Sequence, residues 1–169
     1  LSVYRNLGNF YFQNKTNSGL PALLPETAQV AVDDWNNEDM AGAFVTRTAQ
    51  PPLFFFKQRA GQFVQTNLTA NWPPGHALAL GDLNNDLRLD MALADDKELH
   101  IIFGGMPDRL DLPLAGLQAK TILLLDYDND GWLDVAACGN GIRLWRNAGK
   151  LGFQDVTSAT GLDKLGAVE

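Results

Sequence analysis

The chain has 169 residues, a formal net charge of −7 and a hydrophobic fraction of 46%, with nine Phe and four Trp. This length and apolar content suffice for one domain with a sizeable core, and they exclude a disordered tail. The acidic balance, without a basic stripe, argues against nucleic-acid binding and against attraction to an anionic membrane surface. Because no apolar run approaches the roughly 20 residues of a membrane span, we expect no membrane insertion.

Two short sequence patterns repeat along the chain. The stretch LSVYRNLGNFYFQNKTNSGL at residues 1–20 aligns with IRLWRNAGKLGFQDVTSATGL at residues 142–162. A second, acidic pattern starts at Asp34, Asp82 and Asp126, so successive copies begin 48 and 44 residues apart. A period of about 40–50 residues with several strands per unit is typical of β-propeller blades.

Each of the two stronger acidic stretches lies between short apolar runs of strand length. These runs are GHALALGD and LDMALA in one unit, and KTILLLD and LDVAAC in the next. Turn signals then precede the runs LHIIFG and IRLWRN, and Asn140-Gly141 is a strong hairpin signal. GFQDVT predicts a further strand, and no segment has a convincing helical period with caps. We therefore predict an all-β chain of four-stranded antiparallel sheets.

The repeat units predict an incomplete propeller. We expect five parts: outer strands of a preceding blade at 1–20, a degenerate blade at 26–67, blades with an acidic loop at 76–115 and 119–158, and the start of another blade at 165–169. An open arc leaves strand edges unpaired and a blade face uncovered. We therefore expect the remainder of a larger propeller, or a homo-oligomer, to complete the ring. We also expect Trp145, Phe153 and Tyr4 to pack between neighbouring sheets.

The acidic stretch LDYDNDGWLD at residues 125–134 brings four carboxylates close together. Such like charges repel one another, and a divalent cation relieves the repulsion. Ca²⁺ takes six to eight oxygen ligands, which a tight loop can offer from the side chains at positions 1, 3, 5 and 9 and the carbonyl at position 7. Gly131 at position 6 permits the sharp turn. The predicted ligands are Asp126, Asp128, Asp130, the Trp132 carbonyl and Asp134.

A second loop repeats this spacing, so we predict about two bound Ca²⁺ ions. Its predicted ligands are Asp82, Asn84, Asp86, the Arg88 carbonyl and Asp90. The Asp126 loop has four carboxylates against three here, and a glycine where this loop has Leu87, so we expect it to bind more tightly. An EF-hand is rejected because position 12 is Leu93 in one loop and Ala137 in the other, where an EF-hand has Glu, and because the flanks are strands.

The earliest acidic stretch, DDWNNEDMAGAF, is a weaker version of the same pattern. Asp34, Asn36 and Glu38 stand at positions 1, 3 and 5, but Gly42 at position 9 offers no side-chain ligand. We expect this third loop to be empty or weakly occupied.

The combination of DYDNDGWLDV, LWRN before a glycine-containing turn, and GFQDVTSATGL resembles the FG-GAP/VCBS repeat family. Phe103-Gly104 resembles it more loosely. That family builds the β-propeller of integrin α chains and of many secreted bacterial proteins. The resemblance covers nearly the whole chain and implies one Ca²⁺ per intact loop, bound at the hairpin between the first two strands of a blade. It also implies an extracellular, periplasmic or other cell-envelope location.

The function that follows is a non-catalytic, calcium-binding module that presents loops to a protein or glycan partner. His76 and His100 have no nucleophile or acidic partner at a recognisable spacing, so we interpret them as strand residues. The chain also lacks GxSxG, a Gly-rich phosphate loop and a Cys/His metal pattern. The alternative is part of a propeller-type polysaccharide lyase or hydrolase, because paired carboxylates can perform glycoside chemistry. A purely structural spacer within a larger chain is a third possibility.

Overall fold

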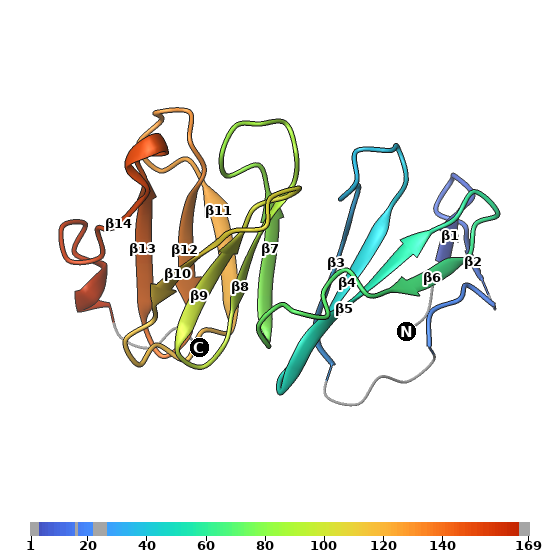
Figure 1. Ribbon diagram of the computed structural model, residues 1–169, viewed down its shortest axis with the longest axis horizontal. Helices are drawn as coiled ribbons and strands as arrows, with labels where there is room; N and C mark the ends of the chain where they lie inside the picture. The colour runs from blue at the N-terminus through green and yellow to red at the C-terminus, as the bar shows by residue number, and fades with distance from the viewer. Residues whose placement is uncertain (1–3, 16, 22–26, 166–169) are drawn as a thin grey trace.

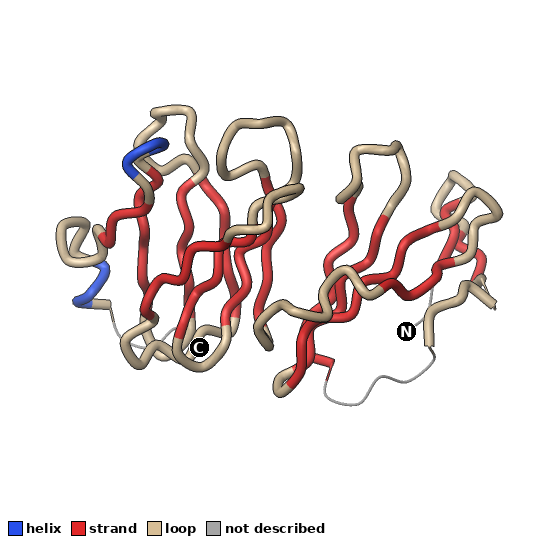
Figure 2. Tube along the Cα trace, viewed as in Figure 1, coloured by secondary structure: helices blue, strands red, loops and turns tan. Residues whose placement is uncertain are grey.

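The computed structural model describes residues 4–15, 17–21 and 27–165, and these form an all-β structure (Figures 1 and 2). A hairpin of β1 (Tyr4–Asn6) and β2 (Phe12–Asn14) comes first. The strands of the first large sheet are β3 (Thr27–Asp33), β4 (Gly42–Arg47), β5 (Gln50–Lys57) and β6 (Phe63–Thr66). Those of the second are β7 (Ala77–Gly81), β8 (Asp90–Ala94), β9 (Glu98–Ile102) and β10 (Arg109–Pro113). Those of the third are β11 (Thr121–Leu125), β12 (Asp134–Cys138), β13 (Ile142–Asn147) and β14 (Phe153–Asp155).

Each large sheet is a four-stranded antiparallel meander, because its strands pair in chain order. The prediction of an all-β chain with four-stranded antiparallel sheets is therefore confirmed. The only helical segments in the described part of the chain are single 3₁₀ turns, η1 (Gly149–Leu151) and η2 (Leu162–Lys164). None of the described helical segments is long and apolar enough to cross a membrane.

The three large sheets lie in a row, with β7 between β3 and β11 (Figure 1). They occupy residues 27–66, 77–113 and 121–155, inside the three blade ranges expected from the repeats. The described residues do not close into a ring. The predicted start of another blade lies almost wholly outside the described residues, because 166–169 are not among them.

The sheets are held together by apolar side chains at alternate strand positions. Between the first and second sheets, Phe44 and Phe54 stack with ring centroids 4.4 Å apart and pack near Met91 and Leu93. Between the second and third sheets, Trp145 is 2% exposed and joins a core that spans both. Burying each large side chain contributes roughly 1.5–3 kcal/mol, so these two interfaces fix how the sheets stack.

The outer faces of the row are covered less completely. Val30 and Val32 are 45% and 58% exposed on β3, while Leu123 on β11 is 53% exposed. Tyr4, which we predicted to pack between sheets, is 59% exposed. That prediction was wrong for Tyr4, because the β1–β2 hairpin places all its residues at the surface.

Candidate metal centre

The three acidic loops have the same backbone course and lie at the same edge of the row. They connect β3 to β4, β7 to β8, and β11 to β12, and all rise at the upper edge in Figure 1. In each loop, positions 4 and 6 have a positive φ. These residues are Asn37 (56°) and Asp39 (57°), Asn85 (57°) and Leu87 (67°), and Asn129 (57°) and Gly131 (87°).

The carboxylate at position 1 organises every loop in the same way. Asp126 accepts hydrogen bonds from the backbone N–H groups of Asp130 and Gly131, both at 3.0 Å. Asp82 accepts the equivalent bonds from positions 5 and 6 at 3.1 and 2.8 Å, and Asp34 accepts them at 3.1 and 2.7 Å. The alternating left-handed residues turn these N–H groups inward, so the side chain and the backbone fold the loop together.

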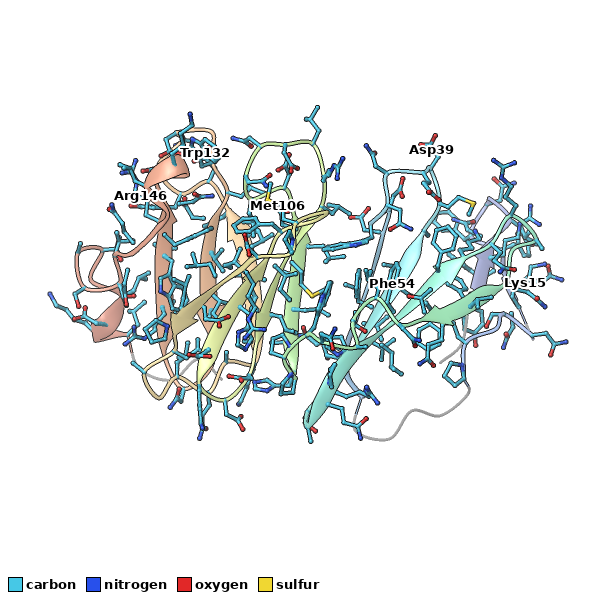
Figure 3. The ribbon with its side chains drawn as sticks, in the orientation of Figure 1. Lys15, Asp39, Phe54, Met106, Trp132 and Arg146 are labelled. Carbon is cyan, nitrogen blue, oxygen red and sulfur yellow. The ribbon has the colours of Figure 1, made fainter. Side chains whose placement is uncertain are left out.

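In the Asp126 loop, three predicted ligands converge. One carboxylate oxygen from each of Asp126, Asp128 and Asp130 lies within 4.8 Å of the other two. Trp132 occupies position 7, and its N–H donates to Asp130 Oδ1 at 3.0 Å. Figure 3 shows Trp132 and Arg146 at this corner of the molecule. The geometry therefore brings three oxygen donors to one centre at the end of the third sheet.

Asp134, the predicted ligand at position 9, has a different environment. It is fully buried, and its two carboxylate oxygens accept backbone hydrogen bonds from Tyr127 (3.0 Å) and Asn147 (2.7 Å). Burial raises the pKa of Asp134; the two hydrogen bonds lower it, and the charges of Asp128 and Asp130 raise it further. Asp134 thus ties the loop to β13 and stands outside the set of three converging carboxylates.

The Asp82 loop repeats this design. Asp90 is fully buried and accepts hydrogen bonds from the backbone N–H groups of Leu83 and Gly104, both at 2.8 Å. Burial raises the pKa of Asp90 in the same way. Asn84 donates from its side chain to Asp86 Oδ2 at 3.2 Å. The N–H of Arg88 at position 7 donates to Asp86 Oδ1 at 2.9 Å. Hydrogen bonds within the loop therefore connect the predicted side-chain ligands Asp82, Asn84 and Asp86, and the buried Asp90 anchors the end of the loop.

The first loop has the backbone of the other two but no carboxylate at position 9. Asp34 holds the loop, while Asn36 and Glu38 line a groove beside Trp35 and Arg88. A Cβ built at Gly42 would fall on the ring of Phe54. The core of the first sheet therefore occupies the space that a ninth-position side chain would need.

Arg146 is a contact of the Asp126 loop that the sequence did not reveal. Its Nε donates to Asp128 Oδ2 at 2.6 Å, and one of its terminal nitrogens donates to Asp130 Oδ2 at 2.8 Å. The hydrogen bond to Asp128 is the main cause that raises the pKa of Arg146. Arg146 lies 16 and 18 residues along the chain from these aspartates. The pairing of β12 with β13, with Val135 opposite Trp145, is what brings Arg146 to Asp128 and Asp130.

A second cluster surrounds His100, which has no acidic partner at a recognisable spacing in the sequence. His100 is a strand residue, as expected, but the fold gives it two partners: Nδ1 lies 2.7 Å from Asp111 Oδ1 and Nε2 lies 3.4 Å from Asp95 Oδ2. His76, interpreted in the same way, lies just before β7 and outside the strands. His100 pairs with Asp111 across β9 and β10, and Glu98 is the third member of a group of possible metal ligands. His100 is only 2% exposed, so a large substrate cannot reach its ring.

The donor set of the acidic loops suits a hard divalent cation. Carboxylate, amide and carbonyl oxygens are what Ca²⁺ prefers, and the loops offer neither imidazole nor thiol. A scan against protein-family models and a search of curated proteins found no match to the chain.

Proposed function

We propose that this chain is a calcium-binding segment of a β-propeller, which serves as a non-catalytic module of a secreted or cell-envelope protein. The observation that carries the proposal is the convergence of Asp126, Asp128 and Asp130 in a loop whose backbone recurs twice more. Arg146 bridges Asp128 and Asp130 but forms no hydrogen bond or ion pair with Asp126, so it accounts for only part of this convergence.

Ca²⁺ has a clear structural task in such a loop. It offsets the repulsion among the aspartates and fixes the connection between the first two strands of a sheet. Two ions are proposed, one in the Asp126 loop and one in the Asp82 loop, with the carbonyls of Trp132 and Arg88 completing the ligand sets. The resemblance to FG-GAP/VCBS repeats supports the choice of Ca²⁺ and an extracellular or periplasmic location, where this ion is plentiful.

The exposed apolar faces support the idea that a larger assembly completes the ring. Val30, Val32 and Leu123 are each 45% or more exposed on the sheets at the two ends of the row. Another blade of the same protein, or a second copy, would cover them as the existing sheets cover each other. The loops at the upper edge would then remain accessible to a protein or glycan partner.

Calorimetric titration of chelator-treated protein with Ca²⁺ tests the proposal. The expected stoichiometry is two, and Asp126→Asn should remove one site while leaving the other. A stoichiometry of zero would refute the proposal. A stoichiometry of three would show that the Asp34 loop also binds, and Gly42 would then be no obstacle.

A further inference from the structure

Arg146 is the one cation that contacts the converging carboxylates of the Asp126 loop in the part of the chain described by the structure. It bridges Asp128 and Asp130, whose side chains are 25% and 27% exposed, while its own is 36% exposed. Charge-assisted bonds of this length in a partly shielded site are stronger than ordinary surface pairs. The guanidinium therefore neutralises part of the charge that would attract Ca²⁺.

Among the residues that the structure describes, none forms an ion pair with the carboxylates of the Asp82 loop. Met91 pairs with Ile102 as Val135 pairs with Trp145, so Phe103 occupies the position that corresponds to Arg146. Phe103 packs against the core between the second and third sheets and carries no charge. The two predicted calcium loops thus differ in how an arginine is used: Arg146 pairs with two carboxylates of the Asp126 loop, whereas Arg88, at position 7 of the Asp82 loop, forms no ion pair with a described carboxylate.

Two opposing effects follow from Arg146. It holds two carboxylates in place, which favours Ca²⁺ binding, and it repels the ion, which disfavours binding. The backbone of the loop does not depend on Arg146, because the Asp82 and Asp34 loops adopt the same backbone without an arginine at this position. The second effect is large, because a charge within a few ångströms of a divalent ion interacts strongly even in a solvated site.

We propose that Arg146 is an internal counter-ion that stabilises the calcium-free Asp126 loop and weakens its affinity for Ca²⁺. This inference rests on the proposed function. It also changes the expected order of affinities, because Arg146 cancels the advantage of the fourth carboxylate in the Asp126 loop. The Asp82 loop then depends more on Ca²⁺ for its order.

The test compares Arg146→Gln with the wild type by calorimetric Ca²⁺ titration at low ionic strength. One of the two dissociation constants should fall by about tenfold, and the gain should shrink in about 0.5 M KCl as the charges are screened. In chelator, the variant should melt at a lower temperature than the wild type, because the aspartates lose their counter-ion. Arg143→Gln is the matched control. Arg143 lies on the same strand and carries the same charge, but it pairs with Asp155 at 2.6 Å.

Each outcome decides the inference. Tighter binding by Arg146→Gln but not by Arg143→Gln supports it, as does a site that appears only in Arg146→Gln. Two wild-type sites whose constants are unchanged or weaker in Arg146→Gln overturn the inference and leave the proposed function standing. No binding by either protein overturns both. If Arg146→Gln does not fold, Arg146→Met decides, because methionine removes the charge and keeps an unbranched side chain: tighter Ca²⁺ binding supports the inference, and equal or weaker binding overturns it.

Discussion

Replacing Leu87 by glycine should stabilise the protein. Leu87 stands at position 6 of its loop with φ of 67°, a left-handed conformation in which a side chain costs roughly 1–2 kcal/mol. Its side chain is 84% exposed, so almost no buried contact is lost. Glycine removes the strain but gives back about 0.5–1 kcal/mol through the flexibility of the unfolded chain. The expected net gain is about 0.5–1 kcal/mol, or roughly 1–4 °C in Tm for a chain of this size.

The assay is thermal unfolding in chelator, which separates backbone strain from metal binding. Leu151→Gly is the matched control: Leu151 is 80% exposed and lies in η1, outside the positive-φ residues. This control should lose about 0.5–1 kcal/mol, because only the flexibility of glycine counts there. If Leu87→Gly lowers the Tm as much as Leu151→Gly does, the claim that the loop strains Leu87 is refuted.

Two further changes probe the first loop and the histidine cluster. Gly42→Asp should create no third Ca²⁺ site and should lower the free energy of unfolding by about 2–4 kcal/mol, because the new side chain meets the Phe54 ring; a third calorimetric site at unchanged Tm would contradict this. His100→Gln should unfold at a higher pH than the wild type in an acid titration followed by circular dichroism. Burial raises the pKa of both Asp95 and Asp111, but hydrogen bonds and the neighbouring His100 outweigh it, so both lie below the ordinary 3.8. Carboxyls with a lowered pKa stabilise the fold above their ordinary pKa and lose that contribution as the pH falls through the folded value. An unchanged acid midpoint in His100→Gln would show that the histidine contributes nothing to these shifts.

Much of the fold follows from local sequence patterns. The alternating apolar runs predict the strands of the second and third sheets, because one face of each strand must be buried. The left-handed positions of the loops carry Asn37, Asn85 and Asn129, and asparagine tolerates this conformation better than most residues. Spacing along the chain therefore indicated both the hairpins and the loops that connect them.

The contacts that sequence reasoning missed all depend on strand register. Arg146 meets Asp128 and Asp130 only because β12 pairs with β13 in one particular alignment. His100 meets Asp111 because the two residues lie opposite each other in the pairing of β9 with β10, and the sequence alone does not say where these strands end and how they align. A shift of one residue would turn either side chain to the opposite face of its sheet, so such contacts require the paired strands themselves.

The central claim is that Ca²⁺ binds and stabilises the acidic loops, and thermal unfolding with and without Ca²⁺ tests it most directly. If Kd is about 10 μM, about 1 mM free Ca²⁺ adds roughly 2.7 kcal/mol per site, and two sites raise the Tm by roughly 10–20 °C over the value in chelator. At a Kd near 1 mM the gain falls to about 0.4 kcal/mol per site, and the shift should then grow as Ca²⁺ is raised further. A Tm that is the same in chelator and at every Ca²⁺ concentration would contradict the account.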